Sequence, residues 1–222
     1  MPEFVAQDVV KEFETANGPL RILDGVSLTI DSGQNLAIVG ESGSGKSTFL
    51  HLAGTLDQAT SGSLEFLQQN PASFNEKQLA EFRNENIGFV FQQHHLLPQL
   101  TALENVLIPF VAQGATTTEM VERCQSLLEK VGLADRMNHR PGLLSGGERQ
   151  RVAVARAMVR QPKMLLADEP TGSLDQANAD TIGQLLIEMQ QETETILICV
   201  THSDRLAGKF DKTLRLEAGK FV

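Results

Sequence analysis

Tryptophan and tyrosine are both missing from this chain of 222 residues, and cysteine occurs only twice. Phenylalanine is therefore the only aromatic residue that could stack on a base. Cys124 and Cys199 lie far apart in apolar stretches and show no metal-ligand spacing. This excludes a disulfide framework and predicts two buried free thiols in a reducing compartment.

Basic residues and long apolar runs are also scarce. The chain carries 19 Lys and Arg against 28 Asp and Glu, a net charge of -9. A general nucleic-acid binder needs a positive field, so we expect no nucleic-acid partner. No apolar run approaches the roughly 18 residues of a transmembrane helix, and residues 1–4 carry no basic region ahead of an apolar stretch. We expect a chain that is neither exported nor membrane-spanning, with enough apolar residues, 41%, for a packed core.

A glycine-rich stretch follows the apolar run at residues 36–39 and leads into a predicted helix. Gly40, Gly45, Lys46 and Ser47 match G-x-x-x-x-G-K-[ST], in which backbone N–H groups surround phosphate oxygens. The lysine would contact the β- and γ-phosphates, and the serine hydroxyl would bind Mg²⁺. An ordinary glycine-serine turn is disfavoured, because chance matches usually lack the strand and the helix. The predicted phosphate-binding residues are Gly40, Glu41, Ser42, Gly43, Ser44, Gly45, Lys46, Ser47 and Thr48.

Polar side chains follow three further apolar runs. Gln92 ends the run at 87–91, Asp168 and Glu169 end the run at 164–167, and His202 follows the run at 195–200. In an open α/β sheet, ligands bind outside the carboxyl ends of the strands. Asp168 is the candidate for the metal, Glu169 for the general base and His202 for a γ-phosphate contact. Taken alone, an Asp-Glu-Pro turn or a single histidine is usually structural.

A second helix opens at Ser145-Gly146-Gly147 and offers another N-terminus suited to phosphate. Arg149, Arg156 and Arg160 fall on one face of this helix. The acidic composition favours a solvated or ion-paired stripe over a nucleic-acid surface.

The rest of the pattern predicts strands and helices around these motifs. Residues 4–13 and 20–30 are expected to be antiparallel strands, 63–67 a short strand and 214–216 an edge strand. Helices are expected over 75–83, capped by Asn75, over 103–112 and 118–131 with an interruption at Pro109, and over 177–191.

Two features leave alternatives open. Phe13 could be a core residue or could stack on adenine, and spacing alone does not separate these interpretations. His94 and His95 invite a metal interpretation, but no carboxylate or cysteine lies nearby at ligand spacing. They are better interpreted as loop or partner-surface residues.

Together these motifs resemble the nucleotide-binding subunits of ABC transporters. Residues 40–47 are similar to their Walker A motif, Gln92 to the Q-loop, 144–148 to the signature sequence, 164–169 to Walker B, 173–175 to the D-loop and His202 to the H-loop. The resemblance implies an α/β fold, a P-loop NTPase core with a mainly parallel sheet, an N-terminal antiparallel β subdomain and an inserted helical subdomain. It also implies a single ABC domain over 1–222, with the core at about 1–92 and 160–222 and the helical part at about 93–159.

The resemblance further implies ATP and Mg²⁺ as ligands and a head-to-tail homodimer that shares two ATP sites. Glu169, His202 and Gln92 would be catalytic, and Ser47, Gln92 and Asp168 would hold the metal. Phe13 stands where the family usually has tyrosine, so stacking stays possible without a hydroxyl. The residues expected to close over the partner's ATP are Ser145, Gly146, Gly147 and Glu148.

Separate transmembrane permease subunits are implied as partners, placing the chain peripherally on the cytoplasmic face of the bacterial inner membrane. They would dock around residues 92–101. Residues 94–98, 101–106 and 138–141 are most similar to ABC subunits that energise lipoprotein release. The alternative is the ATPase of a MacB-like exporter or an FtsE-like cell-envelope regulator.

Overall fold

The computed structural model describes residues 3–16, 18–112, 114 and 116–222. Strands β1 (Phe4–Thr15), β2 (Gly18–Ile30) and β4 (Ser61–Phe66) form an antiparallel sheet in the order β2-β1-β4. The two predicted N-terminal strands are confirmed, each slightly longer than expected. The short third strand is confirmed about a residue or two earlier than expected.

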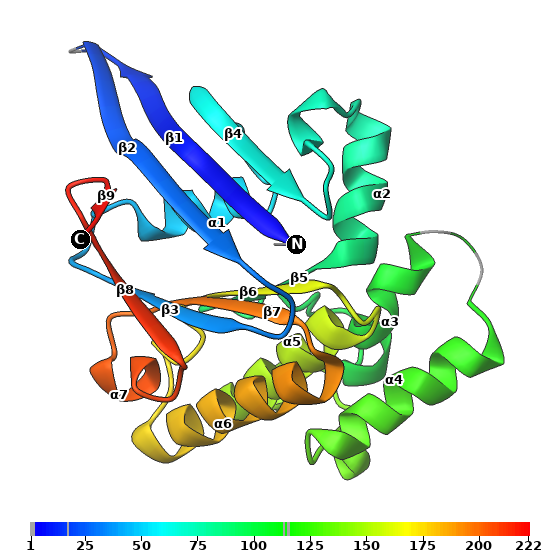
Figure 1. Ribbon diagram of the computed structural model, residues 1–222. Coiled ribbons are helices and arrows are strands. Elements are labelled where there is room, and N and C mark those ends of the chain that lie inside the picture. Colours follow the sequence, from blue (N-terminus) through cyan, green and yellow to red (C-terminus); the bar gives the residue numbers. More distant parts are fainter. Residues whose placement is uncertain (1–2, 17, 113, 115) are drawn as a thin grey trace.

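A six-stranded sheet forms the centre of the molecule, in the order β5-β6-β7-β3-β8-β9 (Figure 1). Its strands are β3 (Asn35–Val39), β5 (Ile87–Phe91), β6 (Met164–Asp168), β7 (Ile196–Val200), β8 (Lys212–Glu217) and β9 (Lys220–Phe221). The first five strands run parallel, with Asp168 beside both Phe91 and Val200. Their carboxyl ends therefore lie along one edge of the sheet, where polar side chains can meet.

The expected edge strand at 214–216 is wrong in its position. These residues belong to β8, which lies between β3 and β9. The chain turns at Ala218 and Gly219, both with positive φ, and folds back as the two-residue strand β9. This short return takes the edge of the sheet.

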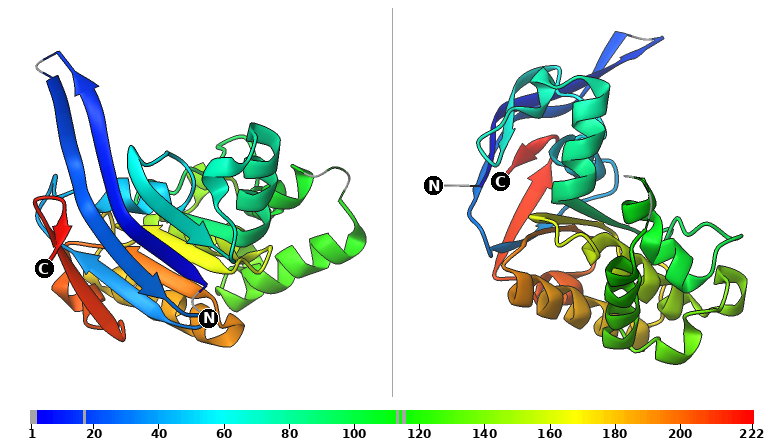
Figure 2. Two further views of the ribbon diagram at one scale, coloured as in Figure 1. Left: turned by 45° about the horizontal axis from the view of Figure 1, so that its top comes forward. Right: turned by 90° about the vertical axis from the view of Figure 1, so that its right-hand side faces the viewer.

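Helix α1 (Lys46–Ala53) and the antiparallel sheet lie on one face of the central sheet, and helices α5 (Gly146–Met158) and α6 (Gln176–Thr193) lie on the other (Figures 1 and 2). Among the residues that the structure describes, the buried apolar ones form two clusters, one on each face of the central sheet, and alternate residues of the parallel strands belong to one or the other. In β7, Leu197 and Cys199 pack with the helices, whereas Ile198 and Val200 pack with the antiparallel sheet. The strands are buried on both faces, which explains their continuous apolar runs. Cys124 and Cys199 are confirmed as buried free thiols.

The remaining helices begin at clear caps. Asn75 is confirmed as the cap of α2 (Glu76–Asn86), where it forms a capping box with Gln78, and Thr101 forms a capping box for α3 (Ala102–Val111). The predicted interruption at Pro109 is wrong, because this proline lies in the last turn of α3, where it removes one N–H donor. The other elements are α4 (Thr118–Lys130), α7 (Asp204–Ala207) and the 3₁₀ turns Pro71–Ser73, Ala134–Arg136 and Pro141–Leu143. Within the described ranges, none of these helices is both long and apolar enough to cross a bilayer.

Candidate functional site

The glycine-rich loop between β3 and α1 passes tightly between β8 and β2. Gly40 has φ of 155°, and a Cβ there would lie 2.3 Å from the Leu216 carbonyl oxygen. Gly45 has φ of 104°, and its Cβ would lie 2.9 Å from the carbonyl oxygen of Ile22. Both positions therefore require glycine. The loop conformation depends on two strands that are distant in the sequence.

Lys46 begins helix α1, and its ammonium group lies against the loop. Its Nζ donates to the carbonyl oxygens of Gly40, at 2.9 Å, and Glu41, at 2.8 Å. An ammonium group has three N–H donors, so one remains for a phosphate oxygen after these two bonds. The N-terminus of α1 adds backbone N–H groups and the positive end of the helix dipole. The loop thus has the donors and the positive charge that anion binding requires.

A cavity of about 460 Å³ opens in front of the loop. It brings together most of the predicted phosphate-binding residues with Gln92, Glu169 and His202. Ile22 also lines it, which the sequence analysis missed because only the tertiary approach of β2 to Gly45 places it there. Glu41 and Ser44 instead line a separate hollow behind the loop, with Leu216. The cavity is lined by Ile22, Ser42, Gly43, Gly45, Lys46, Ser47, Thr48, Gln92, Glu169 and His202.

Ser47 and Asp168 form an oxygen pair at this site. The Ser47 hydroxyl donates to Oδ1 of Asp168 at 3.1 Å. Burial raises the pKa of the Asp168 carboxyl, partly opposed by the bond from Ser47. Mg²⁺ prefers oxygen ligands and keeps few protein ligands beside substrate phosphates. A hydroxyl beside one carboxylate fits that preference, and no group of three or more metal-binding side chains occurs in the described part of the chain.

Glu169 and His202 meet across the ends of β6 and β7. Oε1 of Glu169 lies 2.9 Å from Nδ1 of His202, and Oε2 accepts from the Thr201 hydroxyl at 3.2 Å. Glu169 has φ of 46°, a strained conformation for a residue other than glycine. Its side chain is 17% exposed and that of His202 68%. Sequence reasoning gave Thr201 no role, although it follows the same strand as His202.

Gln92 follows β5 directly and lines the cavity. The Ser173 hydroxyl donates to its backbone carbonyl at 3.5 Å. A Cβ at Gly172 would lie 2.9 Å from Nε2 of Gln92, so the small residue leaves room for the amide. The predicted catalytic side chains of three neighbouring strands thus reach one cavity.

The segment 145–148 opens α5 but does not line this cavity. Ser145 and Glu148 form a capping box: the Ser145 Oγ accepts from the Glu148 N–H, and Glu148 accepts from the Ser145 N–H. A Cβ at Gly147 would lie 2.3 Å from Oδ1 of Asn178 on α6. This turn is held by its own cap and by the start of α6.

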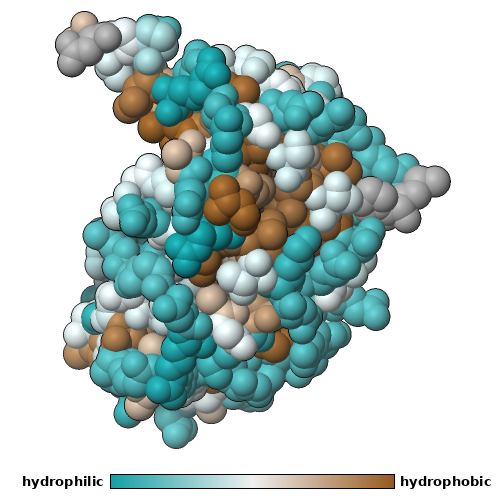
Figure 3. Space-filling view, turned by 60° about the vertical axis from the view of Figure 1, so that its left-hand side comes forward, coloured by the Kyte–Doolittle hydropathy of each residue, from teal (hydrophilic) through white to brown (hydrophobic). Residues whose placement is uncertain are grey.

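Phe13 is 42% exposed, so its interpretation as a core residue is wrong. It pairs with Leu20 across the β1–β2 hairpin, which is also exposed. Figure 3 shows apolar surface near the free end of this hairpin. The ammonium of Lys11 lies 4.8 Å from the centre of the Phe13 ring. Lys11 covers part of the ring, and Phe13 is not among the residues that line the cavity of the phosphate loop.

The expected arginine stripe is also wrong for two of its three members. Arg149 donates to the carbonyl oxygens of Pro141 and Leu144, and Arg156 donates to those of His94 and His95. The partners of Arg149 are carbonyls in the turn just before α5, and those of Arg156 lie in the loop after β5; helical spacing reveals neither. Arg160 does form an ion pair, with Glu85, and also covers the Phe110 ring.

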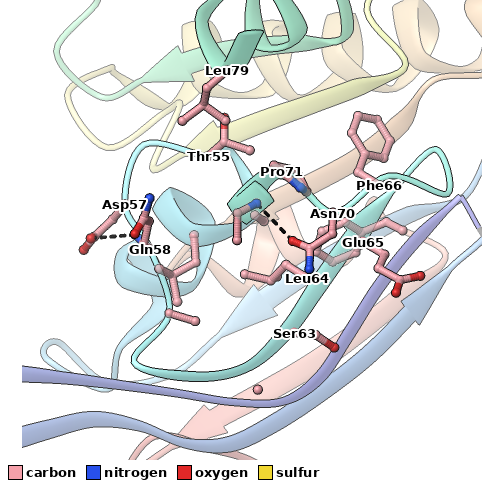
Figure 4. A pocket seen from close by; sticks show the side chains of 16 residues that line it. Thr55, Asp57, Gln58, Ser63, Leu64, Glu65, Phe66, Asn70, Pro71 and Leu79 are labelled. Atoms are coloured by element: carbon pink, nitrogen blue, oxygen red, sulfur yellow. Dashed lines mark hydrogen bonds between the residues drawn. The ribbon is translucent and has the colours of Figure 1, made fainter. Parts of the chain in front are cut away.

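A second, smaller cavity of about 110 Å³ lies between β4, the end of α1 and the turn at residues 71–73 (Figure 4). Leu64 and Phe66 of β4 line it beside Asn70, whose side chain accepts from the N–H of Ala72. None of the predicted site residues lines this cavity. It is separate from the phosphate loop.

The fold and the cavity define a P-loop nucleotide-binding protein, with a parallel sheet, a glycine loop and a Ser–Asp pair. The sequence profile of ABC transporters matches residues 23–172, and the chain belongs to this family.

Proteins named as ATP-binding subunits of the lipoprotein-releasing system are among its relatives. The chain is 49% identical to LolD 1 of Rhodopirellula baltica, over 98% of this chain and 95% of that protein. It is 47% identical to LolD of Legionella pneumophila, over 96% of this chain and 94% of that protein. A solved dimer of the ATP-binding cassette MJ0796, bound to ADP and Pi, aligns with a TM-score of 0.90 and 36% identity, covering 98% of this chain and 96% of that one.

Proposed function

We propose that this chain is the ATP-hydrolysing subunit of an ABC complex that releases lipoproteins from the bacterial inner membrane. The observation that carries the hydrolytic part is the Glu169–His202 pair, which faces the cavity of the phosphate loop. The lipoprotein part rests on relatives that are 45–49% identical and align over nearly the whole chain. MacB-like export and FtsE-like regulation are the alternatives that the experiments below distinguish.

The residues support a direct division of labour. The loop N–H groups, the α1 N-terminus and Lys46 hold the triphosphate, and Phe13 faces the adenine. Ser47, Asp168 and Gln92 would hold the metal ion, which would supply positive charge to offset the charge of the phosphates. Glu169 takes a proton from the attacking water, and His202, held by Glu169, steadies the γ-phosphate. Catalysis here depends on positioning and on charge stabilisation.

Two copies of the chain complete each site. The turn at 145–148 carries a helix N-terminus but lies outside its own cavity. We propose that the Ser145 hydroxyl and the Gly147 N–H of one copy close over ATP held by the other. MJ0796, similar over 98% of this chain, forms a dimer in the solved structures. A closed dimer excludes water, which strengthens every charged contact with the phosphates.

Transmembrane partners would be separate chains, holding this one at the cytoplasmic face of the membrane. The expected docking region at 92–101 adjoins a cavity of about 270 Å³ beside β5 and α3. Phe89, Phe91 and Pro109 supply apolar surface there, and Arg156 and Arg160 supply positive charge. Such a surface suits an apolar helix that carries an acidic residue.

The variant Glu169→Gln tests the hydrolytic mechanism. We expect ATP turnover to fall about 100-fold or more, because the general base is lost, while ATP binding and the ATP-bound dimer persist. Glu122→Gln, on the exposed side of α4, is the matched control and should keep normal turnover. Normal phosphate release from Glu169→Gln would contradict the assignment of the base.

The cargo is tested with membranes. Affinity capture of the chain from native membranes should recover its transmembrane partners. Vesicles reconstituted with both should release a lipoprotein to a soluble acceptor only with hydrolysable ATP. Recovery of a partner with no lipoprotein release, but with export of a small hydrophobic compound or activation of a cell-wall hydrolase, would favour the alternatives.

A further inference from the structure

The loop after β5 is fastened to helix α5 by side chains of that helix. The Gln150 Nε2 donates to the Phe91 carbonyl at 3.2 Å, and Gln150 is 1% exposed. Arg156 donates to the carbonyls of His95, at 2.7 Å, and His94, at 2.8 Å. Residues 91–95 therefore cannot shift along α5 without breaking these three hydrogen bonds.

His94 extends this attachment to the first turn of α5. Its Nε2 lies 3.1 Å from the carbonyl oxygen of Gly146, the first residue of the helix. Because a carbonyl can only accept, Nε2 must carry the hydrogen. Burial lowers the pKa of His94, so the ring is neutral at physiological pH and the bond fixes its tautomer.

The hydrogen bond between His94 and Gly146 links the segment that leaves the nucleotide cavity to the 145–147 turn. His94 is two residues from Gln92, which lines the nucleotide cavity of the same chain. The acceptor of the His94 hydrogen bond, Gly146, lies between Ser145 and Gly147. Two successive glycines lose more conformational freedom on ordering than other residues. An external restraint on the Gly146 carbonyl therefore helps to keep the turn in the orientation that a partner's ATP requires.

We propose that His94 is a positioning residue for the second half of the nucleotide site, orienting the 145–147 turn that closes over ATP bound to another copy of the chain. The inference rests on the proposed two-copy ATPase. It gives a role to a histidine that the sequence analysis placed in a loop or on a partner surface.

The test uses the full chain in the Glu169→Gln background, in which the ATP-bound dimer accumulates. His94→Leu removes the donor, and His94→Gln retains an N–H at a similar distance from the backbone. Loss of one hydrogen bond weakens an equilibrium by a factor of about three to ten. A dimer with two sites loses the contact twice, so we expect the dissociation constant of the His94→Leu dimer to rise about tenfold to 100-fold. ATP binding to the monomer should be unchanged, and His94→Gln should restore most of the dimer.

His139→Leu is the matched control. Its backbone bonds with Arg136 and Ala102 stay in place, and its dimer should dissociate as in the parent. Absence of an ATP-dependent dimer in the Glu169→Gln parent would contradict the proposed function itself. An intact parent dimer with an equally stable His94→Leu dimer would overturn the positioning role, as would a parallel loss of monomer ATP binding.

A measurement on the unmodified chain keeps the inference testable if His94→Leu does not fold. Nitrogen-15 NMR of the histidine rings should show His94 as the neutral tautomer with hydrogen on Nε2 and slow exchange of that hydrogen. A ring with hydrogen on Nδ1, or one that exchanges as fast as His139, would overturn it.

Discussion

The close packing of α5 against α6 at Gly147 can be tested by substitution, because the nearest atoms all belong to one residue, Asn178. A Cβ at Gly147 would lie 2.3 Å from Oδ1 and 2.7 Å from Cγ of Asn178. Overpacking of this kind costs about 1–3 kcal/mol. Replacing glycine in a helix by alanine returns up to about 1 kcal/mol. We therefore expect Gly147→Ala to lower the free energy of unfolding by about 1–2 kcal/mol, or the melting temperature by about 2–8 °C for a chain of this size.

Removing the Asn178 side chain should remove most of the destabilisation caused by Gly147→Ala. Asn178→Ala removes the two atoms that clash and leaves Cβ of residue 178 at 3.3 Å, a tight but tolerable contact. It also removes an exposed hydrogen bond to Asp175, which we expect to cost about 0.5–1.5 kcal/mol. In this background, Gly147→Ala should be close to neutral, so the cycle should show a coupling of about 1–2 kcal/mol.

Urea unfolding of the four proteins measures the cycle. Gly142→Ala is the control, because a Cβ there would meet nothing within 4 Å, and it should change the free energy of unfolding by no more than about 0.5 kcal/mol. Additive effects of Gly147→Ala and Asn178→Ala would refute the clash. So would a Gly147→Ala protein as stable as the parent.

Three other substitutions probe the site. Phe13→Ala should weaken ATP binding by about 1–3 kcal/mol, the range for stacking on a base, with little change in thermal stability because the ring is 42% exposed; unchanged affinity in a titration would exclude stacking. Gly40→Ala should abolish ATP binding, because its Cβ would lie 2.3 Å from the Leu216 carbonyl oxygen; equilibrium dialysis measures the loss, and retained binding would contradict the loop geometry. Asp168→Asn should raise the melting temperature at pH 7 without nucleotide. Burial raises the pKa of the Asp168 carboxyl above 3.8, so the stability that this carboxyl contributes is present at low pH and is lost as the pH rises through the folded pKa. The same variant should lose Mg²⁺-dependent turnover, and a lower melting temperature at pH 7 would show that the Ser47 bond outweighs burial.

Much of the site was predictable because its signals are local. Gly40, Lys46 and Ser47 stand in one motif, and a polar residue after a buried strand marks the ligand-binding edge of the sheet. Asp168 and Glu169 could be assigned to different roles because adjacent residues at a strand end point in different directions. The division into a core and a helical part at about 93–159 stays a prediction, as do the individual roles of the site residues.

The error on Arg156 and the omission of Ile22 arose because the contacts of these side chains lie far along the chain. Arg156 looked like a surface residue by helical spacing, yet its partners are two carbonyls in the loop after β5. Phe13 could not be placed because a half-exposed ring and a buried one follow the same alternation in a strand. Ile22 had no signal of its own, and only the folded approach of β2 to Gly45 brings it to the cavity.

The strand order gives Gln92 a freedom that Asp168, Glu169 and His202 do not share. Among the described strands, β5 forms one edge of the six-stranded sheet and pairs with β6, whereas β6 and β7 each pair with a strand on both sides. Displacing the end of an edge strand breaks one ladder of hydrogen bonds rather than two. The end of β5 can therefore tilt with α5 while the carboxylates and the phosphate loop keep their positions. Of the elements that reach the cavity, it is the one suited to transmit force.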